Sequence, residues 1–330
     1  MTAAPLLEVE DLKTHFFLGT ARPFGSGRRL LKAVDGVSFS IGAGEVLSLV
    51  GESGCGKSTV GRTLTRLETA SGGTARLDGR DILPLSQSEF RPLRREIQMI
   101  FQDPFASLNP RLTIEQTLAE PLRIHGLAKT RAEARALIAE TLQLVGLDPK
   151  VMERYPHEFS GGQRQRIGIA RVMILKPRLV IADEAVSALD VSIQAQVLNL
   201  IKDLQRDSGV SMLFISHDLG VVRHVSDRVA VMYLGRIVEI GTRAEIFEQP
   251  SHPYTRLLLS SIPRIVPGRK RVEDLGEPAN AAAPPPGCAF HPRCKFATDI
   301  CRTTQPLPQA VATGHFSACH HIEDLQKDLA

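Results

Sequence analysis

The stretch "EVLSLVGESGCGKST", from Glu45 to Thr59, joins a short apolar run to a glycine-rich loop and then to a helical pattern that starts at Lys57. The loop contains the spacing G-x-x-x-x-G-K-[ST] and stands directly between a predicted strand and a predicted helix. A phosphate-binding loop needs that context, because its backbone N–H groups then lie at a helix N-terminus. The stretch therefore predicts an α/β fold with a phosphate site at a strand end; the alternative is a glycine-rich turn without chemistry.

Several parts of the loop have separate chemical roles in this prediction. Backbone amides can surround the β- and γ-phosphates, Lys57 adds a fixed positive charge, and Ser58 offers its hydroxyl to Mg²⁺. At Cys55 the backbone matters most, and a redox role for its thiol is the alternative. The predicted ATP-binding residues of the loop are Gly51, Ser53, Gly54, Cys55, Gly56, Lys57, Ser58 and Thr59.

An acidic pair follows a second apolar run, in "LVIADEAVSALD" from Leu179 to Asp190. The predicted strand brings Asp183 to a place where it can hold Mg²⁺ through water, and Glu184 can polarise an attacking water molecule. Alone, the pair would indicate a solvated strand end. Together with the phosphate-binding loop it predicts nucleotide hydrolysis.

The segment "FSGGQRQRIGIAR", from Phe159 to Arg171, places Ser160 at the N-cap of a predicted helix whose first turn holds two glycines. Bare amides and the positive end of the helix dipole would face outward there. This predicts an anion site that a second ATP, held by the phosphate loop of another chain, would complete. The alternative is an ordinary capped helix.

Composition limits the class of protein. The chain has 330 residues, 43% of them hydrophobic, and a net charge of +4, which indicates a folded, soluble protein without the dense basic stripe of a nucleic-acid binder. The start "MTAAPLLEVEDLK" lacks the pattern of a signal peptide, and no stretch approaches 18 uncharged apolar residues. We therefore expect a cytosolic compartment and no nucleic-acid partner.

The order of elements also favours an α/β fold. Apolar runs at 6–12, 45–50, 178–184 and 211–218 read as strands, the last two as buried parallel strands ending in polar residues. Helical patterning occupies much of 111–175, including Thr130 to Val145, and predicts a helical insert. The excursion "FLGTARPFGSGRRLLKA" reads as exposed chain, and "EPANAAAPPPG" reads as a linker.

The ordered set of "GESGCGKST", Gln102 in "IFQDPFASLNPR", "FSGGQ", "VIADEAVSALD" and "FISHD" resembles the ATP-binding subunits of ABC transporters over residues 6–248. The resemblance implies an α/β, P-loop NTPase (RecA-like) core with an antiparallel β edge, a helical subdomain insert and a small C-terminal extension that contains cysteines. The expected boundaries are 1–101 and 172–248 for the core, 102–171 for the helical subdomain and 249–330 for the extension.

The same resemblance assigns roles to single residues. Phe16 would stack on adenine, Gln102 would sense the γ-phosphate and Mg²⁺, Asp190 would lie at a dimer seam, and His217 would contact the γ-phosphate as a catalytic partner of Glu184. The partner's ATP would be clasped by Ser160, Gly161, Gly162 and Gln163, and the expected Mg²⁺ ligands are Ser58, Gln102 and Asp183.

Two positions depart from the family pattern. Ala185 stands where the family usually has proline after the catalytic glutamate, and Phe159 stands where it often has leucine. Neither change removes a catalytic group. Because proline fixes φ and alanine does not, the loop after Glu184 would be looser and hydrolysis slower, but we still expect active hydrolysis.

The C-terminal part is similar to a narrower branch. "HPYTRLLLSSIP" followed by "PPPGCAFHPRC" resembles the tail of dipeptide and oligopeptide importer ATPases. This implies a motor that works with a second ATPase, related or identical, with two membrane permeases and with an extracytoplasmic solute-binding protein, peripherally on the cytoplasmic face of the inner (plasma) membrane. The alternatives are a nickel or glutathione importer, a soluble non-transport ABC ATPase, and a metal-cluster sensor with a regulatory nucleotide domain.

Four of the five cysteines, Cys288, Cys294, Cys301 and Cys319, share the spacing C-x5-C-x6-C-x17-C. The gaps are wider than in most zinc ribbons, whereas iron–sulfur clusters accept varied spacings. A proline-rich tail builds little core, so a metal centre could supply folding energy. A [4Fe-4S] cluster is favoured, as the resemblance also implies, with zinc or free or oxidised thiols as alternatives. The histidines nearby are expected at the surface: His291, His315, His320 and His321.

Overall fold

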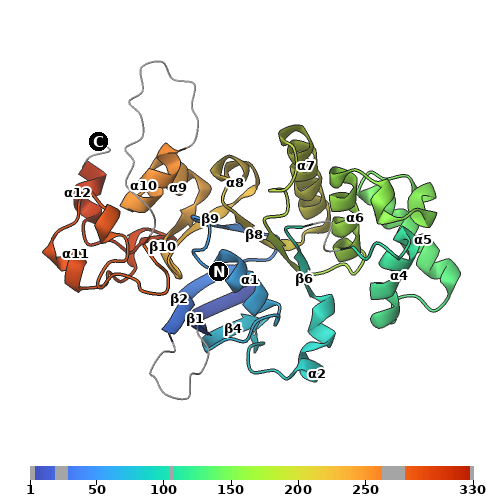
Figure 1. The fold of residues 1–330 in the computed structure, drawn as a ribbon, viewed down its shortest axis with the longest axis horizontal. Coiled ribbons are helices and arrows are strands. Elements are labelled where there is room, and N and C mark those ends of the chain that lie inside the picture. Colours follow the sequence, from blue (N-terminus) through green and yellow to red (C-terminus); the bar gives the residue numbers. More distant parts are fainter. Residues whose placement is uncertain (1–3, 19–28, 104–107, 262–278, 328–330) are drawn as a thin grey trace. The chain divides into compact units, whose positions relative to one another are not determined.

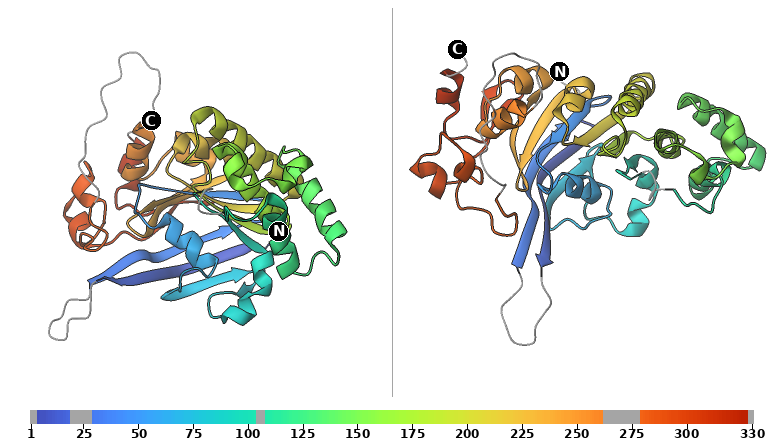
Figure 2. Two further views of the ribbon diagram at one scale, coloured as in Figure 1. Left: turned by 45° about the vertical axis from the view of Figure 1, so that its right-hand side comes forward. Right: turned by 45° about the horizontal axis from the view of Figure 1, so that its top comes forward.

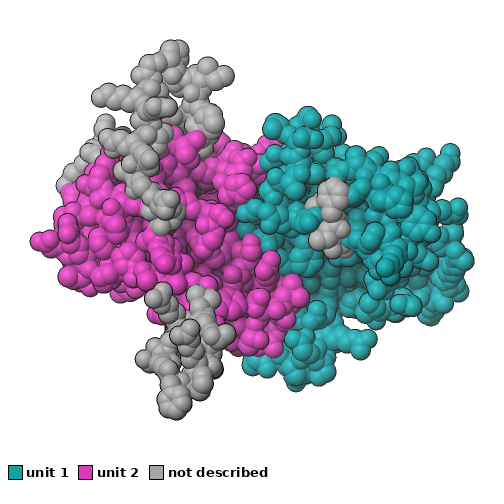
Figure 3. All heavy atoms as spheres, in the orientation of Figure 1, with its two compact units in different colours: residues 1–6, 41–45, 84–215 teal, residues 7–40, 46–83, 216–330 magenta. Residues whose placement is uncertain are grey.

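The structure is a computed structural model that describes residues 4–18, 29–103, 108–261 and 279–327 (Figure 1). The chain divides into two compact units (Figure 3). Unit 1 comprises residues 1–6, 41–45 and 84–215, and unit 2 comprises residues 7–40, 46–83 and 216–330.

Unit 1 contains three parallel strands in the order β8 (Ser211–Ser216), β7 (Leu179–Asp183) and β6 (Ile97–Ile100). Every residue of β7 and β8 is buried. Their unbroken apolar runs suit strands that are covered on both faces, as the sequence predicted. Asp183 is paired in register with Ile215, so the polar residues that follow β7 emerge at the carboxyl edge of these strands.

Three helices of unit 1 pack on one another: α4 (Ile114–Ile124), α5 (Arg131–Leu144) and α6 (Gly161–Met173) (Figure 1). Thr130 caps α5 by accepting a hydrogen bond from the Glu133 amide, and Ile138 and Leu142 are buried one turn apart. This is the predicted helical insert. The other helical elements among the described residues of the unit are α2 (Gln87–Phe90), η1 (Pro92–Arg95), η2 (Pro149–Glu153), η3 (Pro156–Glu158) and α7 (Val191–Ser208).

Unit 2 contains two sets of strands (Figure 2). The first is a sheet with the order β2 (Arg29–Ile41), β1 (Leu7–Leu18), β4 (Gly72–Leu77) and β5 (Arg80–Asp81), in which β4 runs antiparallel to β1 and β5. In the second, β3 (Val46–Val50) runs parallel to β9 (Arg228–Tyr233). The antiparallel strands β10 (Arg236–Thr242), β12 (His315–Ser317) and β11 (Gln309–Ala312) continue this order.

The C-terminal region shares the hydrophobic core of unit 2. Phe290 is 2% exposed and packs with Tyr233 and Tyr254, and Val50 and Val231 belong to the same cluster. The sequence predicted a tail with little core, and the structure corrects this because one aromatic side chain is inserted into the core of the unit. The helical elements in the described part of unit 2 are α1 (Lys57–Leu64), α8 (Leu219–Val225), α9 (Arg243–Glu248), α10 (Pro253–Ser260), η4 (His291–Arg293), α11 (Asp299–Thr303) and α12 (Ile322–Lys327).

The predicted fold class, an α/β nucleotide-binding core with an antiparallel β edge and a helical insert, is confirmed. The expected excursion is shorter than predicted, because β1 reaches Leu18 and β2 begins at Arg29; its residues 19–28 lie outside the described part of the chain, as do residues 104–107 after Gln102. No helix in the described part has the length and apolar character needed to cross a membrane.

Candidate nucleotide-binding site

The predicted phosphate loop connects β3 to α1 in unit 2. Gly51 has φ +156°, and a Cβ there would lie 2.1 Å from the Met232 carbonyl oxygen; Gly56 has φ +107°, and its Cβ would lie 2.0 Å from the Ala33 carbonyl oxygen. Neighbouring backbone therefore excludes side chains at both positions. The two glycines keep the loop tight against the core, in the strand–loop–helix context that the sequence predicted.

Lys57 is 4% exposed, and its ammonium group forms hydrogen bonds within the loop. Its Nζ donates hydrogen bonds to the carbonyl oxygens of Gly51 at 2.8 Å and Glu52 at 2.9 Å. Burial raises the pKa of the Cys55 thiol, although Lys57 opposes this shift. A protonated, buried thiol is a poor nucleophile, which agrees with a mainly structural place for Cys55.

In unit 1, the structure brings two of the predicted residues together. The side-chain amide of Gln102 donates a hydrogen bond of 3.0 Å to the Glu184 carboxylate and one of 3.4 Å to the Ser187 hydroxyl. Asp183, the last residue of β7, is 3% exposed. Glu184 has φ +47°, an unfavourable region for a residue with a side chain, while its amide donates to the Ile215 carbonyl oxygen at 2.9 Å. Such strain is often found at functional residues.

The predicted anion site is the start of α6, also in unit 1. Ser160 caps the helix, since its hydroxyl accepts from the Gln163 amide at 3.4 Å while the Gln163 side chain accepts from the Ser160 amide at 3.1 Å. Gly161 is half-buried. Gly162 is buried, and a Cβ there would lie 2.3 Å from Ile193 Cγ2 on α7. The second glycine therefore also serves helix packing, a reason that the motif alone did not reveal.

The remaining predicted residues are divided between the two units. Phe16 lies half-buried on β1, and His217 is exposed just after β8, both in unit 2. Asp190 is the exposed N-cap residue of α7 in unit 1, without a side-chain capping bond. Their expected roles in nucleotide binding stay predictions.

The four C-terminal cysteines line one cavity in unit 2, together with Phe290 and four histidines: His252, His291, His320 and His321. Burial raises the pKa of Cys288, of Cys294 to about 11 and of Cys319 to about 12. These thiols therefore hold their protons at neutral pH unless a metal displaces them. Within the described residues, no group of three or more His, Cys, Asp and Glu side chains is arranged to hold a single metal ion.

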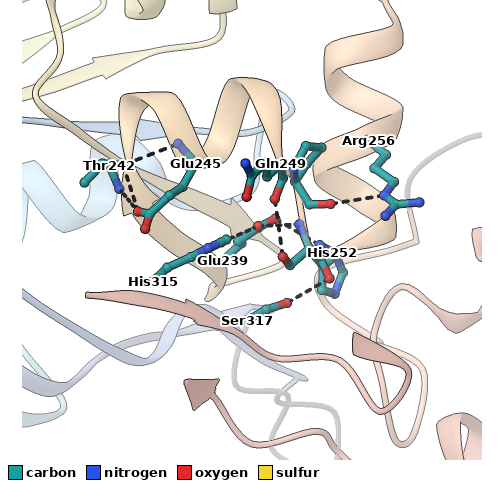
Figure 4. Close-up of polar contacts among 10 residues, drawn as sticks. Glu239, Thr242, Glu245, Gln249, His252, Arg256, His315 and Ser317 are labelled. Carbon is teal, nitrogen blue, oxygen red and sulfur yellow. Dashed lines mark hydrogen bonds and ion pairs between the residues drawn. The ribbon is translucent and has the colours of Figure 1, made fainter. Parts of the chain in front are cut away.

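A buried polar network lies between β10 and β12 and was not predicted from the sequence (Figure 4). Glu239 is 1% exposed; its carboxylate accepts from the amides of Ser251 at 2.6 Å and His252 at 3.0 Å and lies 2.8 Å from His315 Nε2. The expectation of a surface position was wrong for His315, which is 2% exposed. Its ring is buried because it faces a carboxylate that the core cannot leave unpaired.

His252 belongs to the same network. Burial lowers its pKa to about 4, although nearby Glu239 opposes this shift. The neutral ring accepts a hydrogen bond from the Tyr254 amide at 3.1 Å through Nδ1 and so caps α10. The sequence contained a weak signal for this role, a histidine immediately before a proline that opens a helix.

Sequence reasoning also missed an ion pair at the phosphate loop. Arg293 binds the Glu52 carboxylate through both terminal nitrogens, at 2.9 Å each. These hydrogen bonds raise the pKa of the guanidinium above its ordinary value. Glu52 occupies a variable position of the loop motif, so the pattern gave no reason to single it out.

Comparison with known proteins agrees with this arrangement. Residues 34–187 match the family described as ABC transporter, and residues 238–301 match the family described as the C-terminal region of oligopeptide/dipeptide transporters. The chain is 51% identical over 333 residues to the oligopeptide transport ATP-binding protein AppF of Bacillus subtilis. This match covers 97% of this chain and 99% of that protein. It is 49% identical over 324 residues to the putative oligopeptide transport ATP-binding protein YkfD of the same organism, with 97% and 96% covered.

A solved structure supports the same assignment. The dimeric, post-hydrolysis structure of the ATP-binding cassette MJ0796 bound to ADP and Pi superposes on this chain with a TM-score of 0.63 at 26% sequence identity. The match covers 72% of this chain and 98% of that chain. The chain therefore belongs to the family of ABC transporter ATP-binding proteins, in the branch that carries the oligopeptide/dipeptide transporter C-terminal region.

Proposed function

We propose that the protein is the ATP-hydrolysing subunit of an ABC importer of dipeptides or oligopeptides. The hydrogen bond between Gln102 and Glu184 carries the hydrolytic part of the proposal, because it ties the candidate base to the predicted phosphate sensor. The names of the relatives support peptides as the substrate class. Import of nickel or glutathione is the alternative within the same branch.

The chain's own groups can perform the steps of phosphoryl transfer. The amides of Gly51–Thr59 bind the triphosphate, and Lys57 draws charge from the phosphoryl group as it is transferred. Glu184 orients the attacking water and accepts its proton, with Gln102 fixing one carboxylate oxygen. His217 is proposed to keep the γ-phosphate in register.

Magnesium fits the chemistry of the proposed ligands, since they offer a hydroxyl, an amide oxygen and a buried carboxylate, which are hard oxygen donors. We propose from the sequence motifs that Ser58, Gln102 and Asp183 hold the Mg²⁺ ion. The structure supports this proposal through the burial of Asp183, which is 3% exposed. When bound, Mg²⁺ would neutralise charge on the β- and γ-phosphates.

A second subunit completes the proposed site. The capped start of α6, from Ser160 to Gln163, presents amides that we assign to the ATP held by the partner's phosphate loop, with Phe16 on adenine and Asp190 near the seam. ATP then favours the closed pair of subunits, and its hydrolysis releases them. The partner ATPase is identical or related to this chain.

We expect the closure and release of the paired ATPase subunits to change the conformation of transmembrane permeases. A groove in unit 1 is lined by residues of α4 and α5 and of the segments that precede them, including Leu112, Gln116, Ala119, Leu122, Arg123 and Ala134. We assign this groove to a cytoplasmic segment of a permease, and we propose that the protein lies peripherally on the inner face of the membrane. An extracytoplasmic solute-binding protein would deliver the peptide.

We further propose that the four C-terminal cysteines bind a [4Fe-4S] cluster. The support is that all four thiols line one cavity, and that the His321 amide donates to Cys319 Sγ at 3.4 Å, as amides do around cluster sulfurs. Zinc requires its ligands to converge on one ion, and no such group exists among the described residues. A four-iron cluster is held by four cysteines and accepts varied spacings between them, which favours it over zinc for this set.

Peptide uptake tests the proposed function. In a strain in which this chain belongs to the sole peptide importer, its deletion should abolish uptake of radiolabelled trialanine, and the wild-type gene should restore it. Uptake of nickel and of glutathione, measured in the same cells, should not change. Intact trialanine uptake with lost nickel or glutathione uptake would contradict the peptide assignment.

A further inference from the structure

The ion pair between Arg293 and Glu52 joins two segments far apart in the sequence, both within unit 2. Arg293 Nη1 donates to Glu52 Oε2 and Nη2 donates to Oε1, each at 2.9 Å. The side chains are 10% and 25% exposed, so water screens the pair little. Two parallel bonds of this kind fix both the place and the orientation of a carboxylate.

Glu52 is fixed on its backbone as well. Its amide donates to the Tyr254 hydroxyl at 2.9 Å, and its carbonyl oxygen accepts from Lys57 Nζ at 2.9 Å. The residue next to Gly51 thus carries a negative charge inside the loop assigned to an anionic triphosphate. Without Arg293, that charge would be unpaired and would repel the ligand, since partly buried charges interact strongly.

Arg293 belongs to the segment that holds the cysteines. It ends η4, which lies between Cys288 and Cys294, and its amide donates to the Phe290 carbonyl oxygen at 3.0 Å. Its guanidinium lies 5.8 Å from the centre of the Phe290 ring. Phe290 also lines the cysteine cavity, so the position of Arg293 depends on how this segment is folded.

We propose that Arg293 is a positioning residue for ATP binding, which neutralises Glu52 in the phosphate loop and makes the ATP affinity depend on the cysteine segment. The inference rests on the proposed assignment of Gly51–Thr59 to the triphosphate. It holds whether or not the cysteines bind a metal. Cys294 directly follows Arg293 in the chain. A change at the cysteine site would therefore move Arg293 away from Glu52.

A double-mutant cycle on the full-length protein tests this, with the dissociation constant of ATP as readout. Arg293→Gln should weaken ATP binding about tenfold in the wild-type background and by less than about twofold in the Glu52→Gln background, because no carboxylate is then left unpaired. Cys294→Ser should show the same pattern. Arg293→Lys, which keeps the charge and loses the paired bonds, should lie between wild type and Arg293→Gln.

The control is Arg302→Gln, an exposed arginine of the same extension, which should bind ATP like the wild type. Equal losses in the wild-type and Glu52→Gln backgrounds would overturn the inference, since a general loss of folding affects both alike; so would unchanged binding by Arg293→Gln. If Arg293→Gln does not fold, the same cycle is measured with Arg293→Lys, alone and combined with Glu52→Gln.

Lys57→Ala separates this inference from the proposed function. If Lys57→Ala binds ATP as well as the wild type, the loop is not the nucleotide site and the proposed function fails. If Lys57→Ala loses ATP binding while the Arg293 and Glu52 effects are independent, only the further inference fails.

Discussion

The side-chain amide of Gln102 lies 3.0 Å from the Glu184 carboxylate and donates a hydrogen bond to it. Glu184 itself has an unfavourable positive φ and is anchored through its amide to Ile215. Ile215 thus fixes the backbone of Glu184 and Gln102 fixes its carboxylate, at the carboxyl edge of parallel strands where α/β sheets place their ligands.

Gln102→Ala should lower kcat for ATP hydrolysis about fivefold, because the lost hydrogen bond contributes about 1 kcal/mol to the position of Glu184. Steady-state phosphate release, measured with this chain assembled in its transporter, checks this. Gln143→Ala, an exposed glutamine on α5, is the matched control and should be neutral. An unaltered kcat for Gln102→Ala would show that Glu184 needs no such support.

The glycines of the phosphate loop should differ in their tolerance of alanine. Gly54 has φ +79° and open space around it, whereas a Cβ on Gly56 would lie 2.0 Å from the Ala33 carbonyl oxygen. Gly54→Ala should cost about 1–2 kcal/mol from its backbone conformation. Gly56→Ala should cost about 1–3 kcal/mol more, since main chain must move. Urea unfolding measures both, and equal losses would contradict the role given to packing at Gly56.

Stability should decrease as the pH falls from 6.5 to 4, partly because of His252. Its pKa is about 4 in the folded protein and about 6.5 when unfolded, so only the unfolded chain takes up a proton in this window. The loss contributed by this residue is roughly 3 kcal/mol at and below pH 4. The free energy of unfolding, measured in urea at several pH values, gives the slope.

His252→Asn is the control for this pH dependence. Asparagine can still cap α10 by accepting from the Tyr254 amide, but it does not titrate. The slope of stability against pH should therefore decrease by up to one proton. A slope identical to that of the wild type would show that His252 is not the group responsible.

Anaerobically purified protein should contain about four iron and four sulfide ions per chain. Cys294→Ser should lose most of the iron, because its thiol lines the cavity shared by the four C-terminal cysteines. Cys55→Ser should keep it, since Cys55 lies in the phosphate loop. A preparation with about one zinc ion per chain and no iron would contradict the proposed cluster and favour zinc as the metal.

The sequence predicted those features that rest on local patterns. The strand–loop–helix unit around Lys57, the cap at Ser160 and the buried strands before Glu184 and His217 all depend on residues close together in the chain. The periodicity of "TRAEARALIAETLQLV" likewise located α5, and the structure adds Thr130 as its cap.

Features that depend on long-range contacts could not be predicted in this way. Arg293 and Glu52 lie 241 residues apart, and Glu239 and His315 lie 76 apart, so nothing in either neighbourhood indicates the other partner. The need for glycine at Gly162 arises from Ile193 on another helix. The extension was expected to be held by metal, whereas β12 and Phe290 also join it to the strands and core of unit 2.

The identity of the nucleotide held by this chain tests the central claim most directly. The assembled transporter is incubated with α-labelled 8-azido-ATP, crosslinked by light, and the nucleotide on this chain is identified. Wild-type protein should carry labelled ADP, Glu184→Gln should carry ATP with hydrolysis reduced about 10²–10⁴-fold, and the exposed control Glu140→Gln should match the wild type. Labelled ADP on Glu184→Gln at the wild-type rate would contradict the account.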